Sequence, residues 1–490
     1  MRGTRERVIG YIVDHWLSQR SLQYVERNSH RYLVKTMNMK NQLEEKRMSE
    51  QDVPIMTKTI LLGSLLLVCS LLMSGCKPKP SEQKQTGKKG SSAIKETAPP
   101  VADDADAVQL LEKKGVTLTK NAQGQVTIAD FRTLESSDEI LKHLSGLHSL
   151  QRLILYGPGF TSEGLKQVAE LKTLKVLSVE GTRTDDEGLK NISGMTQLIA
   201  LMLRRTNFTD AGLAHLKDLD NLRELDLRFT NVGDAGLVHL KELAKLATVK
   251  LDRTKISDAG IKTLAQIPTL KSLGLNLTNL TNAALDTLAD RKDLKLLEMD
   301  DTQINDEGIK NLAGMTKLQV LHLRRDDVGD DGFKIIGTLT ALKKLSIRDT
   351  VISDEGCAYL KDLKNLQTLD LNETFIGDEG LAHLAGLKNL EVLELWFTRI
   401  SDDGLAHLAG LTNLKSLNLE ETEITDEAMT HLAKLSNLEK LNLKLTPVSD
   451  AGLKKLHGLK KLKSITLGNT KVTEAGITAI KAAIPGIAIQ

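Results

Sequence analysis

Cysteine and aromatic residues are scarce in this chain of 490 residues, and neither sign of charge dominates. The 3 cysteines, Cys69, Cys76 and Cys357, are too few for a disulfide framework. The 66 basic and 64 acidic side chains leave a formal net charge of +2 without a sustained basic tract, which argues against nucleic acid as a partner. Aromatic residues make up only 3% of the chain, so both of its tryptophans, Trp16 and Trp396, are conspicuous.

The sequence also lacks the motifs that carry common chemistry. It contains no phosphate-binding Walker loop, nucleophile elbow, zinc-protease helix, Cys-x-x-Cys pair or haem-attachment motif. We therefore expect a protein that is not an enzyme and that holds no cofactor and no metal.

Residues 56–75 have the layout of a secretory signal, with Lys58 before a 14-residue apolar stretch at Ile60–Met73 and small residues after it. A membrane-spanning helix would need about 20 residues. The sequence LMSGC at 72–76 resembles the bacterial lipobox, with methionine where leucine is usual. This resemblance implies lipidation of Cys76 and cleavage before it, so we expect an exported protein that is lipid-anchored in a bacterial cell envelope. The alternative is an ordinary cysteine after a plain cleavage site.

Two segments flank this signal. Residues 1–55 fit no signal peptide, because they are long and contain several acids, and we interpret them as a misassigned start or as a cytosolic extension. Residues 76–103 are rich in lysine, proline, serine and glycine and have few apolar side chains, a composition that predicts a disordered tether.

The rest of the chain repeats with a period of 24 residues. The repeat that begins at Leu366 continues with Leu369, Leu371, Thr374, Ile376, Asp378, Gly380, Leu381, Leu384 and Leu387, and 14 such repeats follow one another from Leu150 without insertion. Leucines two apart, as at Leu369 and Leu371, predict a strand with one buried face, and apolar residues three apart, as at Leu381 and Leu384, predict a helix. Stacked copies would share one core, which predicts a solenoid.

An aspartate precedes the helical part of 11 of the 14 repeats, as at Asp378. Aspartate is a good helix N-cap, so we predict that these residues cap the helices. A calcium site is disfavoured because one carboxylate per repeat lacks the clustered oxygens that calcium needs. The glycine two residues later, as at Gly380, is expected to let neighbouring helices approach closely.

This spacing resembles the leucine-rich-repeat family, in particular its ribonuclease-inhibitor-like and F-box-associated types, over about Val126 to Ile484. Thr374 and its equivalents take the place of the family's usual asparagine. The resemblance implies an α/β solenoid, a right-handed β-α superhelix with a parallel sheet on the concave face and helices on the convex face. We expect an N-terminal cap at residues 104–147, repeats at 148–484 and a C-terminal edge strand at 485–490.

Function in such a solenoid is expected at strand positions that point opposite to the leucines. In the Leu390 repeat these are Val392, Glu394, Trp396 and, just beyond, Phe397. We define the Trp396 patch as these four residues with Asp370, Asn372, Glu373, Asn418, Glu420 and Glu421. It holds 5 acids and no base, which predicts an aromatic contact point for a partly cationic partner. Alternatively, Trp396 and Phe397 merely lean on adjacent residues.

A second group, the Phe229 patch, combines Arg204, Arg205, Arg228, Phe229, Lys250 and Arg253 with Glu224, Asp226 and Asp252. It is interpreted as a second partner-binding surface or as a solvated face of mixed charge.

Three classes of function can be compared. A monomeric, protein-binding scaffold fits best, because the concave sheet offers ample area for an interface. A glycan-binding module would stack a sugar on Trp396 and use Asp370, Asn372 and Asn418 as hydrogen-bond partners. Hydrolysis by Asp370 and Glu394 is disfavoured, because an open, wet face offers nothing to raise the pKa of one acid or to exclude water.

Overall fold

A computed structural model describes residues 101–135 and 137–490, and within them 17 strands form one continuous sheet. Neighbouring strands are parallel, except that β1 and β2 form an antiparallel hairpin. The strands are β1 (Thr117–Lys120), β2 (Val126–Asp130), β3 (Arg152–Tyr156), β4 (Val176–Glu180), β5 (Ala200–Met202), β6 (Glu224–Asp226), β7 (Thr248–Lys250), β8 (Ser272–Gly274), β9 (Leu296–Glu298), β10 (Val320–His322), β11 (Lys344–Ser346), β12 (Thr368–Asp370), β13 (Val392–Glu394), β14 (Ser416–Asn418), β15 (Lys440–Asn442), β16 (Ser464–Thr466) and β17 (Ala488–Ile489).

Short helices alternate with these strands along the array. The α-helices are α2 (Ala105–Lys113), α3 (Leu165–Val168), α4 (Asp186–Ile192), α5 (Asp210–Leu213), α6 (Asp258–Ala265), α7 (Asn282–Leu288), α8 (Asp306–Ile309), α9 (Asp330–Ile336), α10 (Asp354–Cys357), α11 (Asp378–Leu384), α12 (Asp402–Leu408), α13 (Met429–Leu432), α14 (Asp450–Lys455) and α15 (Glu474–Ala483). The 3₁₀ segments are η1 (Asp138–Gly146), η2 (Ala214–Leu216), η3 (Gly236–Glu242), η4 (Lys310–Leu312), η5 (Ala358–Asp362) and η6 (Leu456–Gly458).

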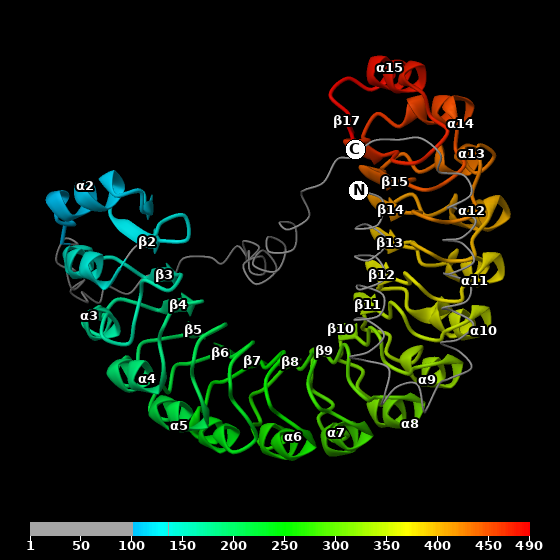
Figure 1. Ribbon diagram of the computed structural model, residues 1–490. Coiled ribbons are helices and arrows are strands. Elements are labelled where there is room, and N and C mark those ends of the chain that lie inside the picture. Colours follow the sequence, from blue (N-terminus) through cyan, green and yellow to red (C-terminus); the bar gives the residue numbers. More distant parts are fainter. Residues whose placement is uncertain (1–100, 136) are drawn as a thin grey trace, which may run out of the picture. The chain divides into compact units, whose positions relative to one another are not determined.

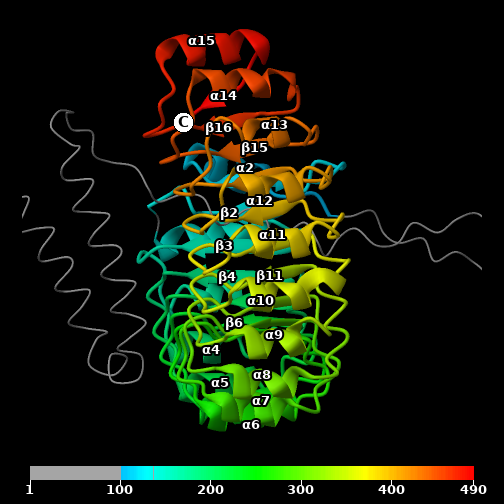
Figure 2. The same ribbon diagram turned by 90° about the vertical axis from the view of Figure 1, so that its right-hand side faces the viewer.

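The repeat array curves, with the strands on its inner side and the helices on its outer side (Figures 1 and 2). Each strand pairs with the next in a register of one repeat, so that Leu369 lies beside Leu393 and Asp370 beside Glu394. The predicted leucine-rich-repeat solenoid, with its concave parallel sheet and convex helices, is therefore confirmed. In some repeats the convex element is partly or wholly 3₁₀, as in η3, where the buried Leu237 and Leu240 are three residues apart and match three residues per turn.

The core is a continuous stack of side chains from every repeat. Leu369 and Leu371 of one repeat are fully buried, as are Leu381 and Leu384 on its helix. The buried Thr374 hydroxyl donates a hydrogen bond to the carbonyl of Leu371 at 2.6 Å, so this threonine closes the turn after the strand within its own repeat. Cys357 also lies in this core, where burial raises the pKa of its thiol.

The aspartate row does not cap its own helices, contrary to the sequence prediction. Asp378 is the first residue of α11, and the N-cap position belongs to Gly377. The Asp378 carboxylate instead accepts hydrogen bonds from the backbone N–H (2.8 Å) and the hydroxyl (2.6 Å) of Ser401 in the next repeat. Ser401 is the N-cap of α12. The aspartates therefore join consecutive repeats through the cap of the following helix.

The glycine two residues after most of these aspartates makes room for this link, although Ala428 takes its place after Asp426. A Cβ on Gly404 would lie 2.2 Å from Asp378 Oδ1, and one on Gly380 would lie 2.5 Å from Asp354 Oδ1. The close approach expected from the sequence is therefore an approach to the carboxylate of the preceding repeat.

Both ends of the array carry additional elements. Helix α2 and the β1–β2 hairpin precede the first repeat, and β17 pairs with β16 at the other end. Val101 and Asp103 were assigned from sequence to the tether, but this N-terminal region holds both of them. The Val101 carbonyl accepts a hydrogen bond from the Gln125 side chain, and the Asp103 carboxylate accepts from the backbone N–H groups of Val126 and His148. None of the helices in the described part of the chain has the length and apolar character of a membrane span. The predicted signal sequence and Cys76 lie outside the described residues.

Candidate binding face

The concave face presents the strand side chains that alternate with the leucines. In β13, Leu393 is buried while Val392 and Glu394 on either side of it are partly exposed, and β10 and β14 have the same pattern. In β6, β8 and β11 the residue after the buried leucine is buried as well. Two further positions follow each strand, occupied in this repeat by Trp396 and Phe397, both half-buried. Stacking of the repeats turns these four positions into parallel rows of side chains along the concave face.

Trp396 is held between residues of neighbouring repeats. The guanidinium of Arg348 lies over the indole, with Cζ 4.7 Å from the ring centroid, which is within cation–π range. The indole N–H donates to Glu421 at 3.4 Å, and the Phe397 ring lies 6.5 Å from the indole in a tilted arrangement. The indole is therefore oriented by fixed contacts, and it still keeps an exposed part.

The Trp396 patch is less acidic than its own sequence indicates, because the repeats on both sides contribute bases. Arg348 binds Glu373, with its Nε 2.8 Å from the carboxylate, and Lys444 binds Glu420 at 2.7 Å. Sequence reasoning missed both bases, since it considered only the Leu366 to Leu414 repeats. Reading the rows of equivalent positions one repeat further in each direction would have found them.

The two carboxylates proposed for hydrolysis lie side by side on β12 and β13, but each has other contacts. Asp370 accepts a hydrogen bond from the Ser346 hydroxyl at 2.8 Å. Contrary to the expectation from sequence, burial raises the pKa of Glu394, and the nearby Asp370 adds to this shift, while hydrogen bonds from Asn418 and Asn372 oppose it. Asn372 is itself engaged, because its side-chain oxygen accepts from the backbone N–H of Trp396 at 2.7 Å.

The Phe229 patch also forms a contiguous group. Arg228 binds both carboxylate oxygens of Asp226, with its Nη2 2.6 Å from Oδ2, and Lys250 binds Glu224 at 2.8 Å. Burial lowers the pKa of Arg228, but the hydrogen bond and charge of Asp226 outweigh it and raise the pKa overall. The side chains that the sequence assigns to the Phe229 patch therefore lie together, and several of them form ion pairs with one another.

Two acids that the sequence did not single out, Glu298 and Asp300, lie close to Asp252 of the Phe229 patch. Burial, aided by the carboxylates of Asp252 and Asp300, raises the pKa of Glu298 to about 7. The Nδ1 atom of His322 lies 3.4 Å from Glu298 Oε1, and burial lowers the pKa of His322. The two shifts favour the uncharged form of each group, so this contact is not a strong ion pair near neutral pH.

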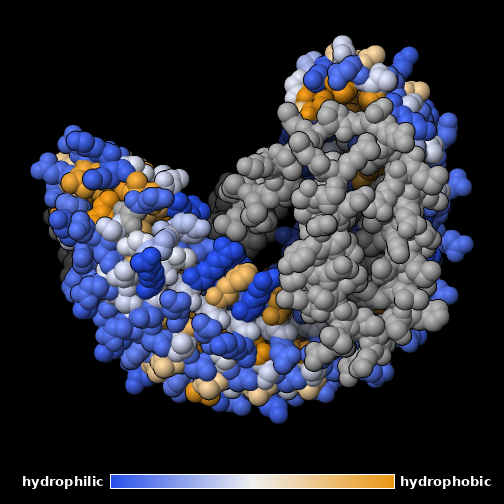
Figure 3. Space-filling model, viewed as in Figure 1, coloured by the Kyte–Doolittle hydropathy of each residue, from blue (hydrophilic) through white to orange (hydrophobic). Residues whose placement is uncertain are grey.

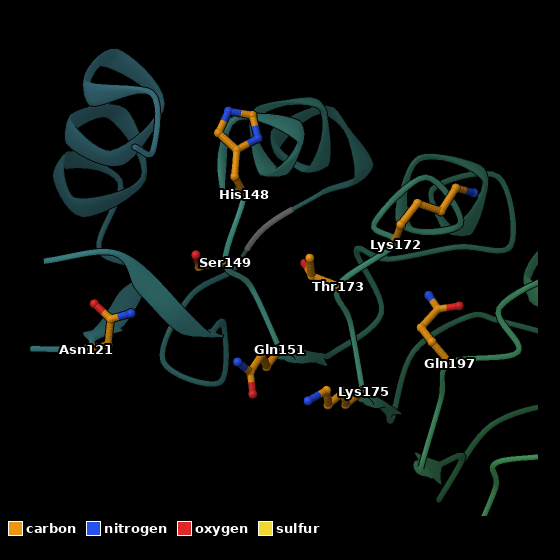
Figure 4. Close-up of a pocket in the computed structure, with 8 residues that line it drawn as sticks. All are labelled: Asn121, His148, Ser149, Gln151, Lys172, Thr173, Lys175 and Gln197. Carbon is orange, nitrogen blue, oxygen red and sulfur yellow. The ribbon is translucent and has the colours of Figure 1, made fainter. Parts of the chain in front are cut away.

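A shallow hollow of about 280 Å³ lies away from both patches, near the N-terminal end of the array. Figure 4 shows polar side chains around it, from the β1–β2 turn and from the segments that precede β3, β4 and β5: Asn121, His148, Ser149, Gln151, Lys172, Thr173, Lys175 and Gln197. Its volume is just below the usual range for small-molecule sites, about 300 to 1,000 Å³. The visible surface of the array is mostly hydrophilic, with its larger hydrophobic areas toward the two ends (Figure 3).

The described residues, 101–135 and 137–490, offer no arrangement of side chains typical of a metal site. In that part of the chain, no group of three or more histidine, cysteine, aspartate or glutamate side chains is arranged to hold a metal ion. His383 and His407, which occupy equivalent positions on α11 and α12, are both exposed on the convex side.

Comparison with known proteins agrees with this geometry. The model of the leucine-rich repeat region family matches residues 128–358 and 303–482, so the chain belongs to the leucine-rich-repeat family. Members of this family are generally non-catalytic, and their repeat domains typically bind proteins.

Solved structures of bacterial repeat proteins are similar to this chain. An internalin from Listeria monocytogenes is 25% identical, with a TM-score of 0.53, over 67% of this chain and 93% of that one. A leucine-rich-repeat protein from Leptospira interrogans is 20% identical, with a TM-score of 0.47, over 73% of this chain and 99% of that one. No curated protein matches the chain.

Proposed function

We propose that this protein is a non-catalytic, protein-binding scaffold of the bacterial cell envelope that engages its partner through the concave face. The observation that carries the proposal is the sheet itself, whose 14 repeats expose rows of polar and aromatic side chains on a fixed framework. At about 4.8 Å per strand the face is roughly 70 Å long, which is ample for a standard protein interface.

Trp396 is the proposed anchor of this interface. Hot spots in protein interfaces are enriched in tryptophan and arginine, and their side chains bind best when held in place before the partner arrives. Arg348 and Glu421 hold the indole in this way.

The experiment is crosslinking in intact cells followed by affinity purification of the full chain. Trp396→Ala should lower recovery of the partner about tenfold or more, as expected for a hot spot. Tyr359→Ala provides a matched control, because Tyr359 is an aromatic residue on the convex η5 with 39% of its surface exposed. Undiminished recovery with Trp396→Ala would contradict the proposed anchor.

A glycan-binding function centred on Trp396 is the second candidate, supported by the part-exposed indole beside Asp370 and Asn418. It is weaker because the Asn372 side-chain oxygen already accepts from the Trp396 backbone. A glycan array probed with wild-type protein and Trp396→Ala separates the two functions. Sugar binding that depends on Trp396 would favour the glycan-binding module.

Membrane attachment through Cys76 is part of the proposal and is supported by the lipobox-like LMSGC sequence at 72–76. More than one acyl chain would make the attachment stable, since a single chain binds membranes only marginally. Labelling of cells with a radioactive fatty acid should mark the wild-type chain and not Cys76→Ser. Label that persists in Cys76→Ser would contradict the anchor.

A further inference from the structure

Three guanidinium groups surround the ring of Phe229 on the concave face. The Cζ atoms of Arg204, Arg205 and Arg253 lie 5.1, 5.2 and 5.4 Å from the ring centroid. Arg204 and Arg205 belong to the repeat before Phe229 and Arg253 to the repeat after it, so the stacking of repeats brings these side chains together. All three distances are within cation–π range, and the ring therefore serves as a common support for three positive charges.

Only one of these three charges is balanced by an acid. Arg204 binds Glu180 at 3.2 Å. Arg205 and Arg253 are both exposed, and no ion pair within the described residues includes either of them. The nearby Asp226 is already bound by Arg228. Two stacked, solvent-facing guanidinium groups thus lie beside one aromatic ring without a carboxylate.

The backbone conformation adds a second observation. Arg205, Phe229 and Arg253 have φ angles of 56°, 58° and 54°, in the left-handed region. Bulky residues there are strained by about 1 kcal/mol, and glycine would relieve the strain. Glycine does occupy the same position in the first two repeats, at Gly157 and Gly181. From Arg205 to Asn469 every repeat has a non-glycine residue at this turn position, and in the Phe229 patch Arg205, Phe229 and Arg253 occupy it in three consecutive repeats.

We propose that Arg205 and Arg253 form a clamp around Phe229 that binds carboxylates in an acidic segment of the protein partner. Guanidinium groups pair with carboxylates through two parallel hydrogen bonds, and stacking on the ring holds their planes ready for this contact. A bound carboxylate would also relieve the repulsion between the two cations. The inference rests on the proposed scaffold function and adds that the partner presents acidic groups at the Phe229 patch.

An acidic peptide fits this surface better than a polyanion such as a sulfated glycan. Glu224, Asp226 and Asp252 lie within the same patch and would repel a densely charged ligand. Carboxylates spaced along such a peptide can pair with Arg205 and Arg253, which lie one repeat before and one repeat after Phe229.

The test measures fluorescence anisotropy of a labelled peptide of alternating glutamate and glycine, with its lysine counterpart for comparison. Arg205→Asn/Arg253→Asn removes the clamp, and asparagine tolerates the left-handed backbone at both sites. Arg183→Asn/Arg223→Asn is the matched control, because it removes the same charge from two exposed arginines outside the patch. The glutamate peptide should bind the wild type and the control equally and the clamp variant about tenfold more weakly.

Several results would overturn the clamp. One is that the wild type binds the glutamate and lysine peptides equally well. Another is that the clamp and control variants lose the same affinity for the glutamate peptide. Heparin binding that depends on the clamp while the glutamate peptide fails to bind would show a polyanion site instead. None of these results changes the expected recovery of the crosslinked partner with Trp396→Ala and Tyr359→Ala. Failure of the clamp can therefore be distinguished from failure of the scaffold function.

Discussion

The carboxylates of the aspartate row join consecutive repeats of this array through hydrogen bonds. The sequence located the aspartate row and the glycine that follows it, because both recur with the period. It could not show that Asp378 bonds to Ser401 of the next repeat, since two residues 23 apart in sequence meet only after the repeats have stacked. The N-cap rule therefore identified the aspartates correctly but predicted that they bond within their own helix, whereas they accept hydrogen bonds from the next repeat.

Asp378→Ala should reduce the free energy of unfolding by about 1 to 3 kcal/mol, because it removes two hydrogen bonds and leaves the Ser401 groups without their acceptor. The measurement is urea unfolding monitored by circular dichroism. Glu379→Ala, at the exposed neighbouring position of α11, is the control and should change stability by less than about 0.5 kcal/mol. Equal effects of the two substitutions would refute the link between repeats.

Asp326 occupies the turn position that threonine holds in most repeats, and it is 2% exposed with no hydrogen-bond partner for Oδ2. Burial, aided by Asp300 and Asp301, raises its pKa well above the usual value. Asp326→Thr should therefore stabilise the fold at neutral pH by about 1 to 2 kcal/mol.

The pH dependence of this gain has a definite sign. A carboxyl whose folded pKa is raised stabilises the fold below its unfolded pKa and loses that contribution as pH rises through the folded value. The advantage of Asp326→Thr should accordingly be small near pH 4 and increase toward neutral pH, as followed by urea unfolding at several pH values. A gain that is largest in acid would contradict the pKa direction.

At the scale of the element, the turn after each strand was the least predictable feature. Twelve non-glycine residues of the described chain have positive φ, and they occupy one position in consecutive repeats, from Arg205 to Asn469. The usual signal for such a conformation is glycine, which only Gly157 and Gly181 provide here. The sequence period located the position but gave no indication of its backbone geometry.

Arg205→Val should cost about 1 to 2 kcal/mol of stability, since a β-branched residue is poorly compatible with the left-handed region. Arg205→Asn should be close to neutral. Arg223→Val, at an exposed position in the neighbouring repeat outside this turn, is the control. Thermal unfolding of the three variants provides the comparison, and an unchanged melting temperature in Arg205→Val would disprove strain at this turn.

In the Trp396 patch, the sequence predicted which residues share a face but not which side chains contact each other across repeats. The period placed Trp396, Glu394 and Asp370 on one face correctly, because strand alternation is a local property. The period could have indicated that Arg348 belongs to the row, but not its contact with the indole, because the side chain reaches past the intervening repeat. Contacts of this kind depend on side-chain rotamers, which the period does not specify.

At the scale of the whole molecule, a solenoid must cover the last repeat of its core. Strand β17 does so by pairing with β16, and Ile487 is only 7% exposed beside it. Deleting residues 485–490 should expose the β16 edge, lower the unfolding temperature and promote self-association in sedimentation velocity. Ala488→Glu, at an exposed position of β17, is the control and should remain monomeric. A truncated chain that stays monomeric and equally stable would contradict a capping role.

The central claim is that partners bind the concave face, and site-specific photo-crosslinking in intact cells tests it most directly. Within one repeat, Ser416 on β14 faces the concave side beside Asn418, and Thr430 on α13 is exposed on the convex side. A photoreactive residue at Ser416 should give a discrete protein adduct, and the same residue at Thr430 should give none. Adducts from Thr430 alone, or from neither position, would contradict the account.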